Sequence, residues 1–185
     1  MTEVSAAHPS LAAIKRAFAE TRLQVVEFRG QTTVVVPPTK LLEILRFLRD
    51  DPECDYNMLL DLGGIDYLGY PAAQPARFAV VYHLVSHRSN LRLRVKVYID
   101  PSLDTTGILD DPALYLDSAT GLWPAAEWAE REVFDMFGIR FRGHPDLRRI
   151  LMWKDYPAHP LRKDYPLRGR GEREHFQRMA RDMAQ

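Results

Sequence analysis

The sequence predicts an α+β fold in which a mixed sheet of about five strands packs against two to three helices and is followed by an extended C-terminal arm. Three observations predict it: apolar stripes at helical spacing early in the chain, runs that alternate apolar and polar side chains, and a proline-rich, basic last quarter. The 185 residues suffice for one domain with a sizeable core, and 46% hydrophobic content argues against disorder. We expect a compact domain over residues 1–143 and an arm over 144–185.

The first part of the chain should form a helix and then a hairpin. Leu11, Ile14 and Phe18 share one face of a helix over 11–20, which Ser10 can cap. Two valine-rich runs separated by a glycine follow, and they indicate a β-hairpin. A double proline ends its second strand.

A second helix and a strand with two glycines come next. Thr39 can cap this helix, its leucines share one face, and Asp51 should end it because a residue before proline leaves the helical region. Residues 57–67 indicate a strand with a kink or bulge at Gly63-Gly64.

Two further runs should complete the sheet. Residues 77–86 are largely apolar, and residues 91–100 alternate aliphatic side chains with arginine, lysine and tyrosine. One face of the last strand should therefore lie on the core, and its other face should be solvated and basic. The loop-rich segment 100–124 follows.

A third helix is predicted over 125–137, with Gly138 as a left-handed C-cap. At 100° per residue, Glu130 falls inside the apolar arc, where a carboxylate is costly unless it is paired, so we expect an arginine partner. Glu132 and Asp135 fall on the opposite side, toward water or a partner's surface.

The zero net charge conceals an uneven distribution. Residues 1–138 hold 13 Lys+Arg and 19 Asp+Glu, a net of −6, whereas residues 139–185 hold 12 and 6, a net of +6. Prolines in the basic part exclude helix over 155–166, and at about 3.1 Å per residue this stretch could form a polyproline-like strip nearly 40 Å long. Its large apolar side chains do not suit a solvated linker. We therefore expect an arm that lies along another protein.

Several chemical functions are disfavoured by the spacing of the reactive residues. The carboxylates of the third helix lack a nucleophile and are better explained as charge pairs at i,i+4 such as Arg131 with Asp135. His83 and His87 would lie about 13 Å apart on a strand, too far to share a metal. One cysteine excludes a disulfide framework and an iron–sulfur cluster held by this chain alone. Aspartates spaced among the arginines of the arm favour a protein partner over nucleic acid.

Three segments carry a recognisable signature: EREVFDMFGI at 130–139, FRGHPDLRRIL at 141–151 and HPLRKDYP at 159–166. The chain closely resembles the C subunit of the proton-pumping NADH:quinone oxidoreductase, known as the 30-kDa subunit of respiratory complex I. Weaker likenesses at 61–67 and 77–82 extend the resemblance over most of the chain. Through the resemblance, the signature and partner interface comprise Glu130, Arg131, Glu132, Asp135, Gly138, His144, Asp146, Arg148, Arg149, His159, Pro160, Arg162, Lys163 and Asp164.

The resemblance implies a non-catalytic structural subunit of the enzyme's peripheral arm. Its C-terminal extension would embrace the D subunit, the large subunit that forms much of the quinone site, and other peripheral-arm subunits such as B and I would be further partners. This chain would bind no cofactor, because FMN, the iron–sulfur clusters and quinone belong to other subunits. It would sit on the cytoplasmic side of the bacterial plasma membrane and associate with the membrane only through the complex.

Two alternatives stay open. One is the equivalent subunit of a related membrane-bound hydrogenase or dehydrogenase complex. The other, from a different class, is an RNA-binding protein with a basic tail, which salt-sensitive RNA binding would reveal.

Overall fold

Five strands form one mixed sheet in the computed structural model, which describes residues 8–172. The strand order is β1-β2-β5-β4-β3; β2 and β5 run parallel, and the other neighbours run antiparallel. The strands are β1 (Gln24–Phe28), β2 (Gln31–Val36), β3 (Met58–Asp66), β4 (Phe78–Ser86) and β5 (Leu91–Ile99). The predicted hairpin, the three later strands and the α+β class are confirmed.

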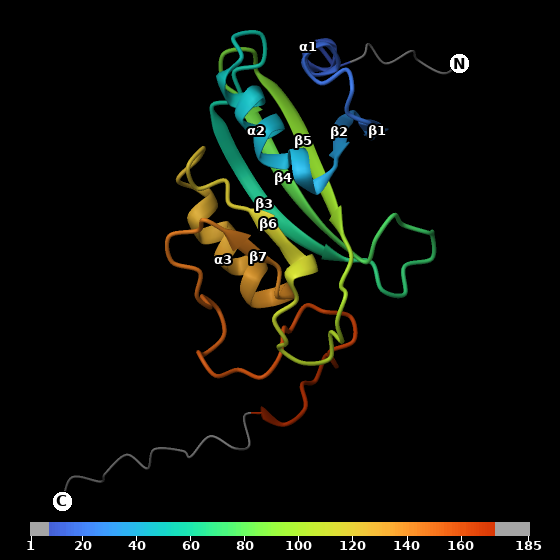
Figure 1. Cartoon of the computed structure of the whole chain (residues 1–185), viewed down its shortest axis with the longest axis vertical. Helices are drawn as coiled ribbons and strands as arrows, with labels where there is room; N and C mark the ends of the chain where they lie inside the picture. Colours follow the sequence, from blue (N-terminus) through green and yellow to red (C-terminus); the bar gives the residue numbers. More distant parts are fainter. Residues whose placement is uncertain (1–7, 173–185) are drawn as a thin grey trace, which may run out of the picture.

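The helices lie against this sheet and bury its apolar face. They are α1 (Ser10–Ala17), α2 (Leu41–Asp50) and α3 (Ala126–Phe137). Figure 1 shows α2 lying over the sheet, with α3 farther along and packed on β3. Alternate residues of β5, namely Leu93, Val95 and Val97, are buried in the core that α1 and α2 cover. The period of two in the sequence therefore placed this strand correctly.

Neither predicted N-cap forms. The Ser10 side chain bonds another part of the fold, and α2 begins later than predicted. The Ser10 hydroxyl is buried and hydrogen-bonds the Tyr56 hydroxyl at 2.9 Å. Before α2, a short 3-10 turn, η1 (Pro38–Lys40), contains Thr39, so the α-helix begins after it and lacks a side-chain cap. Burial of a polar side chain and a preceding turn both override the local capping signal.

The predicted irregularity of β3 occurs at a different place. The register shifts between Leu59 and Asp61, whereas Gly63 and Gly64 pair regularly with β4. Packing explains why residue 64 is a glycine. A Cβ on Gly64 would lie 2.5 Å from Cδ2 of Phe137 in α3. The glycine thus permits a close approach of helix to strand.

A second, two-stranded sheet was not predicted. It pairs β6 (Tyr115–Asp117), which follows a 3-10 turn, η2 (Pro112–Leu114), in parallel with β7 (Arg140–Arg142). Strands of three residues are too short to show an alternation pattern. They bring the loop before α3 next to the chain that leaves it.

The chain after β7 is irregular, as the prolines require, but it is not one straight strip. Backbone hydrogen bonds bend it into turns at Trp153–Tyr156, His159–Arg162 and Arg162–Tyr165. The expected span of nearly 40 Å is therefore wrong, because local turns satisfy amides that a polyproline-like strip would leave to solvent. Figure 1 shows this part curving below α3 and the end of the sheet.

Candidate functional site

Residues 144–172, which we call the C-terminal segment, are fastened to the body by two clusters of charged groups. The first is centred on Asp135 of α3, which is fully buried. One carboxylate oxygen accepts the backbone N–H groups of Ile150, Leu151 and Met152 at 3.0, 2.7 and 2.8 Å, and the other accepts the Arg149 guanidinium at 2.6 Å. Burial acts to raise the pKa of Asp135, but these donors outweigh it and lower the pKa.

This burial overturns the expectation that Asp135 faces water or a partner's surface. The helical wheel placed Asp135 on the correct side of α3, but the C-terminal segment of the same chain covers that side. The expected pairing with Arg131 is also replaced, since Arg131 donates to the Arg148 carbonyl at 3.1 Å. A helical wheel cannot show which later segment returns to a polar face.

Arg149 and His159 extend the first cluster along the segment. The second guanidinium nitrogen of Arg149 donates to the carbonyl oxygens of Tyr156 and Ala158 at 2.9 and 3.0 Å. Nδ1 of His159 lies 2.9 Å from the Asp135 carbonyl oxygen, and burial lowers the pKa of this histidine to about 4. The neutral imidazole therefore donates a hydrogen bond to the helix backbone at neutral pH.

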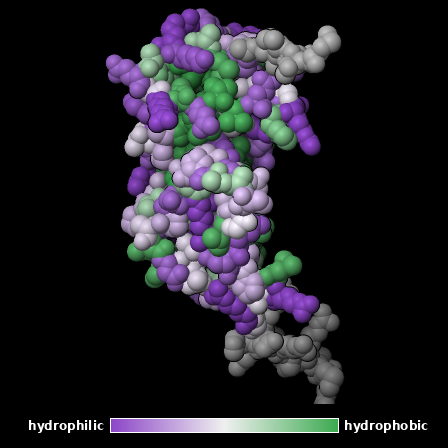
Figure 2. All heavy atoms as spheres, turned by 90° about the vertical axis from the view of Figure 1, so that its right-hand side faces the viewer, coloured by the Kyte–Doolittle hydropathy of each residue, from purple (hydrophilic) through white to green (hydrophobic). Residues whose placement is uncertain are grey.

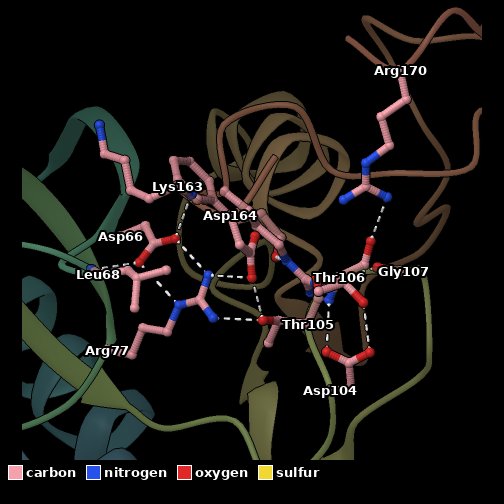
Figure 3. Close-up of polar contacts among 12 residues, drawn as sticks. Asp66, Leu68, Arg77, Asp104, Thr105, Thr106, Gly107, Lys163, Asp164 and Arg170 are labelled. Carbon is pink, nitrogen blue, oxygen red and sulfur yellow. Dashed lines mark hydrogen bonds and ion pairs between the residues drawn. The ribbon is translucent and has the colours of Figure 1, made fainter. Parts of the chain in front are cut away.

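The second cluster joins the sheet to the C-terminal segment (Figure 3). Arg77, immediately before β4, contacts Asp66 at the end of β3 with nitrogen–oxygen distances of 3.1 and 2.9 Å. The same guanidinium donates to Asp164 at 2.9 Å, and the Thr105 hydroxyl donates to that carboxylate. The Lys163 amide donates to Asp66 at 2.8 Å. Carboxylates from two distant parts of the chain thus share one arginine.

Arg162 lies between the two clusters and is almost fully buried. Its Nε donates to the Phe137 carbonyl at 2.7 Å, and one terminal nitrogen donates to the Thr105 carbonyl at 2.8 Å. A cation at the C-terminal end of α3 is favoured by the helix dipole. Two separate reasons require glycine at position 138. Its φ of +75° is left-handed, and a Cβ there would clash with Nη2 of Arg162.

Glu130 is the other buried carboxylate of α3, and its surroundings differ. It accepts the Ser118 hydroxyl and the Ala119 amide, each at 2.7 Å, and no arginine is among its partners in the described part of the chain. The expected arginine partner is therefore wrong, because the loop beside β6 supplies neutral donors instead. Desolvation raises the pKa of Glu130 to about 7.

The remaining signature residues lie nearer the surface. His144 Nε2 lies 3.0 Å from the Glu127 carbonyl oxygen, and Arg148 forms an exposed ion pair with Asp146 at 2.7 Å. Glu132 and Lys163 are exposed, and Pro160 is half-buried. The signature residues therefore form no single cavity.

The sequence motifs missed three anchor residues, Asp66, Arg77 and Thr105. The first two lie in the weaker likenesses at 61–67 and 77–82, which was the signal available. Thr105 lies in a loop without any pattern. Its role depends on a contact with residue 164, which local sequence cannot reveal.

Comparison with known proteins identifies the family of this chain. Residues 34–171 match the family described as "Respiratory-chain NADH dehydrogenase, 30 Kd subunit". The chain belongs to this family. The matched range spans both anchoring clusters and nearly all of the C-terminal segment.

Members of the 30-kDa subunit family from several bacteria are similar in sequence. The C subunit of NADH-quinone oxidoreductase from Citrifermentans bemidjiense is 47% identical over 84% of this chain and 87% of that protein. The C subunit of the same enzyme from Roseiflexus sp. is 47% identical over 83% of this chain and 80% of that protein. The chain is therefore similar to subunits of NADH-quinone oxidoreductase over most of their length.

Two solved structures share the fold. A trypsin-resistant fragment (1–134) of Nqo5 has a TM-score of 0.61 and 35% identity, covering 74% of this chain and 96% of that one. A chain of an archaeal membrane-bound sulfane sulfur reductase, a respiratory membrane complex, has a TM-score of 0.66 at 22% identity and covers 94% of each. The second likeness shows the fold alone. Within residues 8–172, none of the helices has the length and apolar character needed to cross a membrane.

Proposed function

We propose that this chain is a non-catalytic structural subunit in the peripheral arm of NADH:quinone oxidoreductase, and that its C-terminal segment docks on the large quinone-site subunit of that enzyme. One observation carries the proposal: the anchoring clusters hold the segment on the body while leaving large apolar side chains outside. Leu151, Leu161 and Leu167 are 62%, 51% and 104% exposed. Side chains of this kind are suited to burial against a partner.

The anchors explain how a segment without helix or sheet can present a defined surface. Turns alone would leave the segment free to adopt many conformations, and a partner would then lose affinity to the entropy of ordering it. Asp135, Arg149 and Arg162 each hold backbone groups of the segment or of the body beside it. The surface is therefore organised before the partner binds.

The electron-transfer groups belong to other subunits in this proposal. FMN, the iron–sulfur clusters and quinone would be held by neighbours, with the B and I subunits beside the large quinone-site subunit. Association with the cytoplasmic side of the bacterial plasma membrane would be indirect. The fold supports this division of labour, since the buried charged groups of the signature bind the chain's own backbone.

Substitution of one exposed leucine tests the docking surface. Leu161→Asp in the full chain should lower recovery of the large quinone-site subunit in complexes purified from membranes at least tenfold, with a parallel loss of NADH:quinone activity. Leu60→Asp is the matched control, because Leu60 is also 51% exposed but lies on β3. Normal recovery of the large quinone-site subunit with Leu161→Asp would contradict the proposal.

The same purification separates the alternative assembly. The purified complex could contain a nickel–iron hydrogenase subunit and lack both the large quinone-site subunit and the NADH-oxidising subunits. That composition would support a related hydrogenase-type complex. The archaeal reductase with the same fold shows that this architecture also occurs in another respiratory membrane complex.

A further inference from the structure

The sheet has a second face that the helices leave uncovered, and it is hollowed. The face carries the residues of β5 that alternate with its core residues, together with their neighbours on β2 and β4. A groove of about 860 Å³ lies here, bounded by the β1–β2 hairpin on one side and by the loop over 67–77 on the other. None of its lining residues belongs to either anchoring cluster. We call it the sheet groove.

The walls of the sheet groove expose apolar side chains. Phe28 is 63% exposed, Tyr70 is 56% exposed and Val26 is 42% exposed, and all three line the groove. Figure 2 shows the side of the molecule that carries β1, β2 and the 67–77 loop, where apolar atoms gather in the upper half with hydrophilic groups around them. A sheet face of this composition is usually covered by another layer of structure.

The floor of the groove is positively charged. Arg94 and Lys96 stand two residues apart on β5, and their side chains hydrogen-bond neutral oxygens of Gln31 and Tyr67. Neither takes part in an ion pair within residues 8–172. His83 also lines the groove, and Glu27 is the one acidic residue among the described residues that line it. The cations therefore exceed the acids on this surface.

Lys96 is held in place by aromatic rings. Its ammonium nitrogen lies 4.8 Å from the centre of the Tyr67 ring and 4.5 Å from that of Tyr98. Tyr98 in turn donates to Gln74 of the bordering loop at 3.0 Å. A positioned cation binds a carboxylate with less loss of side-chain entropy than a free lysine would.

We propose that the sheet groove binds an acidic amphipathic helix of a neighbouring protein, with its carboxylates on Arg94 and Lys96 and its aliphatic side chains on Val26 and Phe28. Charge complementarity selects the acidic partner, and the apolar walls select the amphipathic one. The chain's own last residues, 173–185, do not fit, since they hold three arginines against two acids. This surface is distinct from the docking surface of the C-terminal segment.

Site-specific crosslinking tests the inference in the intact complex. A photo-reactive phenylalanine analogue replaces Phe28 in the full chain, and the crosslinked peptide is identified by mass spectrometry after purification from membranes. We expect a peptide of another protein with helical apolar spacing and at least two carboxylates. Adding Arg94→Glu should reduce the crosslink yield at least fivefold, and reversing the identified partner carboxylate to lysine should restore it.

Arg46→Glu is the control for charge reversal, because Arg46 is exposed on α2, away from the groove. It should leave the crosslink yield unchanged. A crosslink to this chain's own termini, to a second copy or to a basic segment would overturn the inference, as would a yield insensitive to Arg94→Glu. If Arg94→Glu lowers the melting temperature, Phe28→Ser provides the second variant: assembly lacking the identified partner supports the inference, and unchanged assembly overturns it.

Discussion

At the scale of single residues, two carboxylates on one helix are buried in opposite electrostatic states. Asp135 receives three amides and a guanidinium, so its ionised form is favoured and its pKa is lowered. Glu130 receives one hydroxyl and one amide, which do not offset desolvation, and its pKa rises to about 7. The number and charge of the donors decide the outcome, since both side chains are fully buried.

Asp135→Asn should destabilise the protein by about 2–4 kcal/mol, because it leaves the Arg149 charge buried without its counter-ion. The contribution of Asp135 should be present above the ordinary aspartate pKa of 3.8 and lost as the pH falls toward its lowered value. Urea unfolding at pH 7 and at pH 3 measures both effects. Glu132→Gln, an exposed acid on the same helix, should change stability by less than about 0.5 kcal/mol. An equal loss in the two variants would contradict the proposed role of Asp135.

Glu130 should give the opposite pH dependence. Its pKa is raised from 4.5 to about 7 by folding, so its contribution is present below pH 4.5 and lost as the pH rises through 7. Glu130→Gln keeps the shape without the charge: its amide oxygen can accept the Ala119 N–H, and its amide NH2 can donate to the Ser118 hydroxyl oxygen, which reverses that hydrogen bond. It should therefore exceed the wild type in stability by about 1–3 kcal/mol at pH 8 and match it near pH 5. A constant difference between the two proteins from pH 5 to 8 would show that Glu130 does not titrate in this range.

Truncation of the same side chain has a different effect. Glu130→Ala leaves the Ser118 hydroxyl and the Ala119 amide without their acceptor, at a cost of about 1–3 kcal/mol. Glu132→Ala removes an exposed group and should cost less than about 0.5 kcal/mol. Melting temperatures at pH 6 compare the two variants. Equal losses would contradict the assignment of the helical faces.

At the scale of elements, the sequence predicts the helices and strands that have a local pattern of apolar spacing, alternation or turn residues. Alternation located β5, apolar spacing located the helices, and Gly138 marked the end of α3. The caps at Ser10 and Thr39 were wrong because a tertiary hydrogen bond and a 3-10 turn replace them. The β6–β7 pair and the partners of Asp135 and Asp66 were not predictable, since they join residues far apart in the sequence.

The two neighbouring glycines of β3 give a direct test of helix packing. Gly64→Ala places a methyl group 2.5 Å from a carbon of the Phe137 ring, so either that ring or α3 must shift away from the strand. We expect a loss of about 1–3 kcal/mol in the free energy of unfolding. Gly63→Ala is the control, because no atom lies within 4 Å of the position that its added methyl group would take. If both variants lose the same stability, strand propensity rather than packing explains Gly64.

At the scale of the whole molecule, the charge asymmetry has two roles. The basic last quarter supplies Arg149 and Arg162, which are directed inward to fasten the segment, whereas Arg148 and Lys163 stay at the surface. The sequence alone assigned this charge to a partner's surface. Part of it instead holds the chain to its own body, and only the exposed part is available for the proposed contact with a partner.

The chain cut after residue 143 should fold but should unfold at a lower temperature than the full chain. Within residues 8–172, the buried members of the main apolar cluster lie between Leu11 and Phe141, so this cluster survives the cut, although buried Tyr156 and Ala158 are lost. The cut removes the donors to Asp135, and we expect a loss of about 2–4 kcal/mol, or roughly 5–15 °C in melting temperature. A chain cut after residue 172 keeps every described anchor and should melt within a few degrees of the full chain.

Recovery of the partner from membranes separates the two roles of the C-terminal segment, which are to stabilise the body and to dock on the partner. The 1–143 chain should recover none of the large quinone-site subunit from membranes even at 10 °C, where its body remains folded by circular dichroism. Asp135→Asn in the full chain keeps the exposed leucines but loosens their anchor, so it should recover that partner with reduced yield. An unfolded 1–143 chain would place the segment within the core and refute the boundary at residue 143. A folded 1–143 chain that still recovers the partner would instead move the docking surface to the body.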